Sequence, residues 1–313
     1  MTRDQIRKIR SLQENVGRVF YGKPDVIKSL LVALFSAGHV LIEDVPGVGK
    51  TLVARALARS LSCSFQRIQF TADMLPSDVI GVSVYNQQRE EFVFKQGPLF
   101  ANVVLADEIN RTSPRTQSSL LEGMNDIQVS VDGVTHPLPR PFLVLATQNP
   151  FEFEGTYPLP ESELDRFFVR VAVGYPDHES SMRILRDYVT MDAVEHLHPV
   201  MSGPEVLDLQ QAAADVSVEE RVADYVLRLV ERSREMSEVQ VGISPRGALA
   251  LYRASQALAM VEGRDYVIPD DVKTICPSVF IHRLVCRGNS SREPGSPAAR
   301  AIEEILNSVP VPV

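Results

Sequence analysis

The chain has 313 residues, enough for two domains, and an ordinary globular composition with 44% hydrophobic and 23% charged residues. Its 40 acidic and 32 basic side chains give a net charge of −8, which argues against a dedicated nucleic-acid surface. Cys63, Cys276 and Cys286 show no disulfide or metal-binding spacing, and the charged residues 1–10 do not resemble a signal peptide, so we expect a cytoplasmic protein without a transmembrane segment.

The N-terminal region is predicted to contain two helices before the first strand. Apolar residues recur at helical spacing from Ile6 to Val19. After an interruption at residues 20–24, a second helix is expected at about 25–37. The apolar run that begins at about His39 then indicates a buried strand, which the turn at Pro46-Gly47 ends.

A glycine-rich loop, Gly47–Thr51, separates this strand from an Ala- and Leu-rich segment, residues 52–60, that is expected to be a helix. Strand, glycine loop and helix N-terminus in this order form the setting in which backbone N–H groups bind phosphate. Lys50 is expected to reach the β- and γ-phosphates, and the Thr51 hydroxyl to hold Mg²⁺. Asp44 stands where the usual motif begins with glycine, and we interpret it as a turn residue that points away from the phosphates.

The rest of the first half alternates between strands and helices. This alternation predicts a parallel sheet sandwiched by helices, in an α/β domain covering residues 1–175. Further strands are expected at 63–70, 102–108, 142–147 and 167–173, a helix at 113–124, and two β-hairpins at about 78–95 and 127–135, the second with an Asp-Gly turn.

The composition changes at residues 174–177, and no strand is expected beyond them. The second half, residues 176–313, is therefore predicted to be a small all-α domain. Its helices are expected at 179–191, 203–214, 217–236, 245–261, 269–279 and 298–307, with a Ser/Pro/Gly-rich loop at 288–297.

Several polar residues stand where chemistry is expected. Asp107 and Glu108 end a buried strand, where Asp can hold Mg²⁺ through water and Glu can activate the attacking water. Asn149 follows the next strand and is a candidate for orienting that water. Arg166 and Arg246 are candidates for stabilising phosphate charge. Taken singly, each also has an ordinary explanation. Asp107 and Glu108 could be an exposed acidic pair, and Asn149 a turn residue. Arg166 could belong to a surface ion pair, and Arg246 could simply stand at the start of a helix.

In combination these elements resemble the AAA+ ATPases, and specifically the MoxR group, from Val19 to Pro312. The matching runs are 39–51, 96–98, 106–111, 117–124, 146–150, 154–161 and 164–167, with 244–246 and 263–272 in the second half. The chain departs from the common pattern at Lys23, Arg115 and Ser162-Glu163, and none of these changes removes a charge needed for hydrolysis.

The resemblance implies a P-loop NTPase (AAA+) α/β domain followed by a small all-α lid domain, with ATP or ADP and Mg²⁺ as cofactors. Glu108 is implied as the catalytic base, Asn149 as sensor 1, Arg166 as a finger acting on a neighbouring subunit, and Arg246 as sensor 2, with Asp107 and Thr51 at the metal. Nucleotide contacts are implied for Phe20, Tyr21 and Gly22 at the adenine and for Pro46, Gly47, Val48, Gly49, Lys50, Thr51 and Leu52 at the phosphates.

The function implied is an ATP-hydrolysing, chaperone-like protein that remodels or activates a partner as a hexameric ring. The family expectation for the partner is a von Willebrand factor A domain protein, through which peripheral membrane association would be possible. Two alternatives remain open from the sequence: a nucleotide-gated scaffold with low turnover, and a DNA-associated motor. The net charge of −8 and the lack of a recognisable nucleic-acid domain count against the motor, so no nucleic-acid partner is expected.

Overall fold

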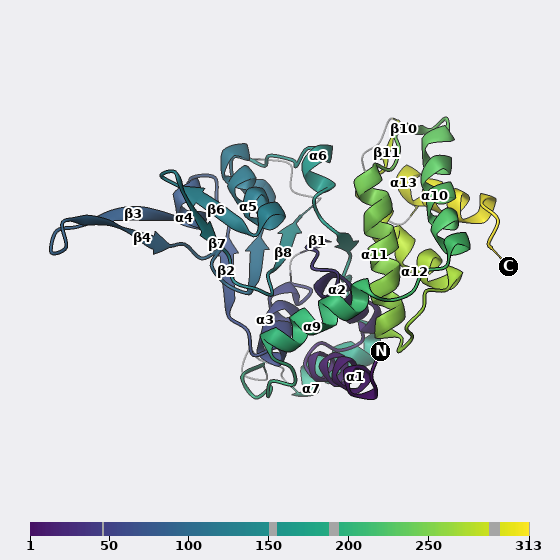
Figure 1. The fold of residues 1–313 in the computed structure, drawn as a ribbon, viewed down its shortest axis with the longest axis horizontal. Coiled ribbons are helices and arrows are strands. Elements are labelled where there is room, and N and C mark those ends of the chain that lie inside the picture. The colour runs from purple at the N-terminus through teal and green to yellow at the C-terminus, as the bar shows by residue number, and fades with distance from the viewer. Residues whose placement is uncertain (46, 150–154, 188–193, 288–294, 313) are drawn as a thin grey trace.

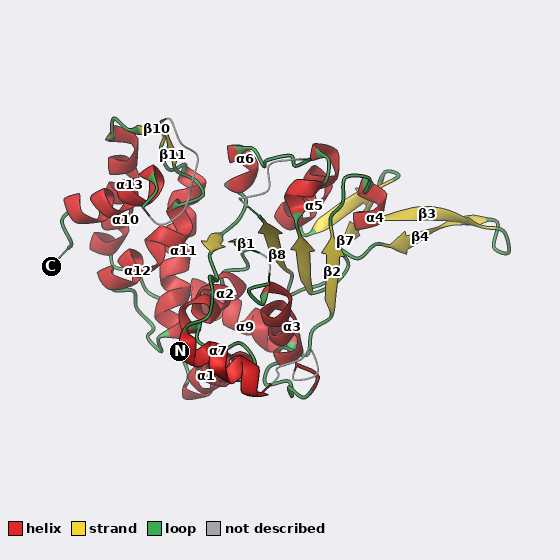
Figure 2. Cartoon of the chain, turned by 180° about the vertical axis from the view of Figure 1, so that it is seen from behind, coloured by secondary structure: helices red, strands yellow, loops and turns green. Residues whose placement is uncertain are grey.

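A computed structural model describes residues 1–45, 47–149, 155–187, 194–287 and 295–312. Its centre is a five-stranded parallel sheet, visible in Figures 1 and 2. The strands are β1 (Val40–Glu43), β2 (Phe65–Gln69), β5 (Val103–Asp107), β8 (Leu143–Gln148) and β9 (Val169–Val171), and their spatial order is β2-β5-β8-β1-β9. The predicted α/β sheet is confirmed, and every one of its strands was expected within a few residues of these bounds.

Helices cover both faces of the sheet, and successive side chains of its three central strands, β5, β8 and β1, enter different apolar clusters. In β5, Val103 and Leu105 belong to one apolar cluster, whereas Val104 and Ala106 belong to the other. The first cluster includes residues of α1 (Arg3–Gly17), α2 (Pro24–Phe35) and α3 (Lys50–Ser60). The second includes residues of α4 (Pro76–Ile80), the 3₁₀ helix η1 (Ile109–Arg111) and α5 (Pro114–Asp126).

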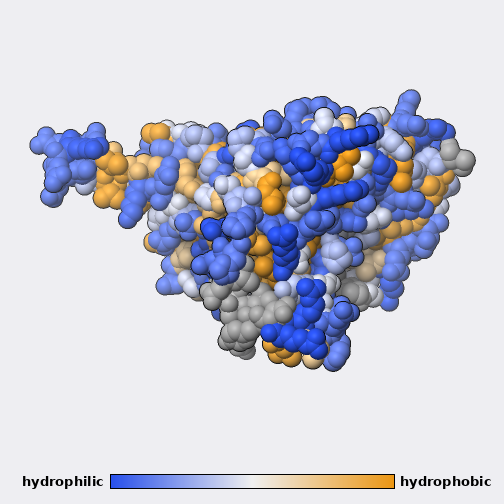
Figure 3. All heavy atoms as spheres, turned by 90° about the horizontal axis from the view of Figure 1, so that it is seen from below, coloured by the Kyte–Doolittle hydropathy of each residue, from blue (hydrophilic) through white to orange (hydrophobic). Residues whose placement is uncertain are grey.

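Both predicted hairpins are present. One pairs β3 (Gly81–Asn86) with β4 (Glu91–Gln96), and the other pairs β6 (Gln128–Val131) with β7 (Val134–Pro137). The second turns at Asp132 and Gly133, which have positive φ angles of 51° and 79°, as a tight Asp-Gly hairpin turn requires. The β3–β4 hairpin projects from the body, with apolar side chains along its length and a hydrophilic tip (Figures 1 and 3).

The six helices expected in the second half are confirmed. They are α7 (His178–Asp187), α9 (Gly203–Ala214), α10 (Glu220–Glu235), α11 (Pro245–Val261), α12 (Pro269–Phe280) and α13 (Pro297–Ser308). Serines at the N-cap positions of α11 and α13 accept backbone hydrogen bonds, and Pro follows each of them at the first helical position. Parts of the expected 179–191 helix and 288–297 loop lie outside the described residues.

The prediction that no strand follows residue 174 was wrong. Val239–Val241 (β10) and Val285–Cys286 (β11) form a small antiparallel pair beside α10 and α13 (Figure 2). Strands of two or three residues are too short to show an alternating pattern, so they leave no periodic signal in the sequence.

The second half packs closely on the sheet domain. Helix α11 lies against α2, α12 lies against β9, and α9 touches both α2 and α11. The domain boundary at residue 175 stays a prediction, because α9 packs against a helix of the first half, α2, as well as a helix of the second half, α11. Within the described ranges, no helix is both long enough and apolar enough to cross a membrane.

An ionic contact of Arg283, just beyond the end of α12, joins the two halves of the chain at Asp165. Arg283 is 6% exposed, and its Nε donates to Oδ1 of Asp165 over 2.8 Å. The Ser244 hydroxyl donates to the other carboxylate oxygen over 3.0 Å. Burial lowers the pKa of Arg283 to about 10, against the opposing effect of Asp165, so the guanidinium stays charged at neutral pH.

Candidate functional site

The connection between β1 and α3 forms the floor of the candidate site. Gly47 and Gly49 have φ angles of 84° and 91°, a left-handed region that L-residues with a side chain rarely adopt. A Cβ added to Gly47 would meet no atom within 4 Å, so the loop faces open space there. Helix α3 begins at Lys50, two residues before the predicted start, and its first N–H groups are therefore at the loop. Pro46 lies outside the described residues.

A cavity of about 490 Å³ opens above this loop. It collects residues from the loop and from the carboxyl ends of two neighbouring parallel strands, β5 and β8, as the Asp107, Glu108 and Asn149 interpretation requires. Its described lining consists of Gly47, Gly49, Lys50, Thr51, Leu52, Arg55, Arg67, Asp107, Glu108, Asn149 and Val194. Eight of the predicted site residues are thus brought together around one space.

Lys50 is half-buried at this cavity. Its Nζ donates to the backbone carbonyl oxygen of Asp44 over 2.9 Å. Burial lowers the pKa of Lys50, and the charges of Asp107, Asp44 and Glu108 oppose that effect. The Asp44 carboxylate accepts hydrogen bonds from the backbone N–H groups of Val45, over 2.8 Å, and Gly174, over 2.6 Å. These contacts agree with the interpretation of Asp44 as a turn residue.

The two carboxylates at the end of β5 are held in place by different partners. Thr147 Oγ1 donates to Oδ1 of Asp107 over 2.6 Å, and the same hydroxyl accepts from the backbone N–H of Glu108 over 2.9 Å. The Glu108 carboxylate accepts from Gln69 Nε2 over 2.8 Å and pairs with Arg111 Nε at 3.0 Å. Glu108 itself has φ 58°, a left-handed conformation that costs about 1 kcal/mol or more for a residue with a side chain.

Arg67 binds the second carboxylate oxygen of Asp107. Its Nη2 lies 2.6 Å from Oδ2 of Asp107 and 2.6 Å from Oε1 of Gln69. The sequence reasoning missed Arg67, Gln69, Thr147, Arg111 and Arg55. No local pattern in the sequence indicates Gln69, because only the pairing of β2 with β5 sets it directly beside Asp107.

The donor set fits a magnesium–nucleotide complex. Hydroxyl and carboxylate oxygens, here of Thr51 and Asp107, are the ligands that Mg²⁺ prefers. The N-terminus of the 11-residue helix α3 and the Lys50 ammonium suit a polyanion. The open face of the loop at Gly47 leaves room for phosphates beside these groups.

The remaining predicted residues lie away from the cavity lining. Arg166 is partly buried and its Nη1 donates to the carbonyl oxygen of Leu121 on α5 over 3.4 Å. Arg246 is exposed in the first turn of α11. Val48 is partly buried against the first core cluster. In this structure neither arginine is therefore brought to the phosphate loop of its own chain.

The three residues expected at the adenine lie between the loop and α7. The Phe20 ring packs on Gly49, where an added Cβ would be 3.3 Å from it. The Arg183 guanidinium lies 4.2 Å from the centre of the Tyr21 ring. Gly22 has φ 72° and touches Ser180 so closely that a Cβ could not be added.

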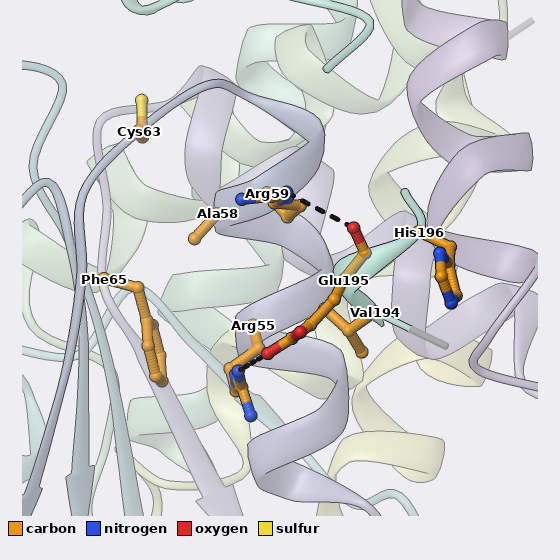
Figure 4. A pocket seen from close by; sticks show the side chains of 8 residues that line it. All are labelled: Arg55, Ala58, Arg59, Cys63, Phe65, Val194, Glu195 and His196. Atoms are coloured by element: carbon orange, nitrogen blue, oxygen red, sulfur yellow. Dashed lines mark hydrogen bonds and ion pairs between the residues drawn. The ribbon is translucent and has the colours of Figure 1, made fainter. Parts of the chain in front are cut away.

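A second cavity of about 610 Å³ adjoins the first, and Arg55 and Val194 line both. Figure 4 shows Arg55 and Arg59 of α3 directed toward Glu195, with Phe65 of β2 on the opposite wall. The Arg55–Glu195 ion pair is 3.7 Å long, and Arg59 Nη2 donates to the Glu195 carbonyl oxygen over 3.2 Å. The lining of this cavity includes neither Gly47 and Gly49 nor Asp107 and Glu108, so the phosphate-loop cavity is the candidate active site.

Comparison with known proteins places this geometry in a family context. Residues 39–169 match the family model for the ATPase family associated with various cellular activities (AAA), and residues 231–305 match the AAA lid domain. The chain is 47% identical to the uncharacterized protein YeaC of Bacillus subtilis (strain 168), with 96% of this chain and 93% of the relative covered.

Two further similarities agree with this match. The chain is 44% identical to Chaperone MoxR1 of Mycobacterium tuberculosis (strain H37Rv), with 95% of this chain and 80% of the relative covered. A crystal structure of a candidate ATPase from Cytophaga hutchinsonii superposes with a TM-score of 0.90 at 38% identity, over 99% of this chain and 96% of that one.

Proposed function

Because the chain belongs to the MoxR family of AAA ATPases, we propose that it hydrolyses ATP with Mg²⁺ and uses the reaction to remodel or activate a partner protein. The observation that carries the proposal is the convergence of Lys50, Thr51, Asp107, Glu108 and Asn149 on one cavity above the phosphate loop. Each of these side chains has a separate chemical task in phosphoryl transfer to water.

The loop and its lysine bind the phosphates. The N–H groups of Gly47 to Leu52 and the Lys50 ammonium would hold the β- and γ-phosphates, while Thr51 and Asp107 would hold the metal. Bound Mg²⁺ would neutralise charge that develops on the transferred phosphoryl group. Phe20, Tyr21 and Gly22 are proposed to border the adenine, because the Phe20 ring already packs on Gly49.

Glu108 and Asn149 act on the water. The Glu108 carboxylate would accept a proton from the attacking water, and the Asn149 amide would orient that water. In this structure Gln69 and Arg111 hold the Glu108 carboxylate, so basal turnover is expected to be low until these contacts loosen. The same observation is what favours the second candidate function, a nucleotide-gated scaffold.

Arg166 and Arg246 are proposed to join the site from a neighbouring subunit and from the second domain, respectively. Since Arg166 does not line the cavity of its own chain, it is proposed to act in a neighbouring subunit of a hexameric ring. Arg246 is proposed to reach the nucleotide from the lid, residues 176–313, when that domain closes. The partner proposed from the family resemblance is a von Willebrand factor A domain protein, and the compartment is the cytoplasm.

Two variants test the proposal together. Lys50→Ala should lose nucleotide binding, because the phosphate charge is left without its cation. Glu108→Gln should bind ATP like the unmodified protein and lose hydrolysis by at least about a hundredfold. Equal hydrolysis rates for Glu108→Gln and the unmodified chain, measured with partner present, would rule out the enzyme and leave the scaffold. Affinity capture on Glu108→Gln with ATP would identify the partner.

A further inference from the structure

Arg67 enters the candidate site from the edge strand of the sheet. Side chains two residues apart on a strand lie on one face, so Arg67 and Gln69 project from β2 together. The register pairs Gln69 with Asp107 and Arg67 with Leu105. The Arg67 guanidinium extends along the strand from there and lines the phosphate-loop cavity.

The guanidinium holds one particular oxygen of the metal carboxylate. Arg67 Nη2 and Nε both lie near Oδ2 of Asp107, at 2.6 and 3.2 Å, while Oδ1 accepts from the neutral Thr147 hydroxyl. The Asp107 side chain is 14% exposed and that of Arg67 is 46% exposed. The cation therefore covers the carboxylate from the cavity side, whereas the hydroxyl holds it from within the sheet.

We propose that Arg67 is a tethered counter-ion for Asp107, which Mg²⁺ must displace when it binds with nucleotide. This inference rests on the proposed nucleotide site and adds a positioning residue to it. A guanidinium and a divalent cation on one carboxylate repel each other, so occupancy of Oδ2 by Arg67 competes with the metal. The side chain thus neutralises Asp107 in the empty site and raises the Mg²⁺ concentration needed to fill it.

Displacement of Arg67 also affects Glu108. The nitrogen that binds Asp107 also donates to Gln69 Oε1, and Gln69 Nε2 in turn donates to the Glu108 carboxylate. When Arg67 leaves, Gln69 loses the partner that fixes its amide. Metal binding therefore weakens the hydrogen bond from Gln69 to Glu108, and the Glu108 carboxylate becomes available to accept a proton from water.

The direct test is the Mg²⁺ dependence of nucleotide binding. Binding of a fluorescent ADP analogue is measured at increasing free Mg²⁺ and constant ionic strength, so that no turnover intervenes. Arg67→Gln should lower the half-saturating Mg²⁺ concentration by about three- to fivefold, the upper part of the range expected for a partly exposed ion pair. Arg67→Lys, which keeps the charge, should stay within about twofold of the unmodified protein.

Arg59→Gln is the matched control. It removes the same charge from α3, but Arg59 lines the neighbouring cavity and donates to the carbonyl oxygen of Glu195, not to Asp107. Its half-saturating Mg²⁺ concentration should move by less than about twofold. An unchanged or raised Mg²⁺ requirement in Arg67→Gln overturns the proposal, and simple destabilisation cannot imitate the expected result because it would weaken binding.

A second measurement separates this proposal from the proposed function. Mn²⁺ binding to the nucleotide-free protein, followed by electron paramagnetic resonance, should be tighter in Arg67→Gln than in the unmodified chain. Failure to bind any nucleotide would reject the ATPase, while the Mn²⁺ comparison would still decide the role of Arg67. Equal Mn²⁺ binding by the two proteins would reject Arg67 as a competing counter-ion.

Discussion

The Nε atom of Arg283 lies 2.8 Å from Oδ1 of Asp165, and this contact joins the end of α12 to the residue that precedes Arg166. The Arg283 side chain is 3% exposed and also donates to the carbonyl oxygen of Phe168 over 3.1 Å. Ser244 at the N-cap of α11 donates to the other Asp165 oxygen, so this one carboxylate links the segment that contains Arg166 to the helix that carries Arg246.

Asp165→Asn should destabilise the protein by about 2–4 kcal/mol, because it leaves the buried Arg283 without its counter-charge. Urea unfolding measures the free energy directly. The control is Asp224→Asn, which breaks a pair with Arg228 whose side chains are 53% and 56% exposed. That change should cost less than about 0.5 kcal/mol. If both variants lost the same free energy of unfolding, the buried Asp165–Arg283 contact would contribute no more to stability than the exposed pair.

Because His39 is buried, the protein is expected to lose stability in mild acid. Its Nδ1 accepts from the Val144 backbone N–H over 3.1 Å, so Nε2 carries the proton and donates to the Met124 carbonyl oxygen at 2.8 Å. Burial lowers the pKa of His39 from 6.5 to about 4, although the Met124 contact opposes the shift. Because the unfolded chain binds the proton more readily, this contribution is complete above pH 6.5 and is lost as the pH falls toward 4.

The size of this effect can be measured by unfolding at several pH values. About 2 kcal/mol should disappear between pH 7 and pH 5 through His39 alone. His39→Gln keeps one donor and one acceptor but cannot titrate, so its stability should fall less over the same interval. Identical pH profiles for the two proteins would contradict the assignment.

The position of Arg166 predicts complementation between inactive chains. Arg166→Ala should bind ATP normally and hydrolyse it at least about a hundredfold more slowly, as expected for a lost arginine finger. Lys50→Ala should be inactive because it cannot bind ATP in its own cavity. Mixed rings should regain activity, since a Lys50→Ala subunit can supply Arg166 to a neighbour that binds ATP. No recovery in mixed assemblies would place Arg166 outside the shared site.

Replacement of Arg246 is expected to change nucleotide affinity, whereas replacement of Arg166 is expected to change the rate of hydrolysis. The side chain is exposed in the first turn of α11, so Arg246→Ala should leave the unfolding free energy within about 0.5 kcal/mol. Loss of its charge should weaken ATP binding about tenfold if the lid closes over the nucleotide. Titration with a non-hydrolysed ATP analogue would measure the change. Unaltered affinity together with an unaltered rate would remove Arg246 from the site.

Contiguous features of the site were predictable, whereas features that depend on strand register were not. The Gly47–Thr51 loop and the Asp107-Glu108 pair each carry their chemistry within a few adjacent residues. Arg67 and Gln69 alternate with buried Ile68, which is the pattern of any edge strand with a solvent-facing side. Only the pairing of β2 with β5 turns these two polar residues toward the carboxylates.

The helices were predictable for a similar local reason. Ser202, Ser244 and Ser296 precede Gly-Pro or Pro at the starts of α9, α11 and α13, and such starts are readable from the sequence. The ionic contact of Arg283 with Asp165 was not foreseen, because 118 positions separate the two residues along the chain. A buried arginine is recognisable only after the fold has brought its partner to it.

The apolar core on the α1–α3 side of the sheet has a consequence for modularity. It does not stop at the sheet domain, because Leu251 and Val272 of the second half belong to the same cluster as Leu31 and Val40. Eight residues of α2 are buried, and α9 and α11 cover part of that helix. A chain cut near residue 175 would expose this surface to water and should precipitate or unfold. Any movement of the second half on nucleotide binding is therefore expected to keep this shared core intact, and the two halves are not expected to fold as independent pieces.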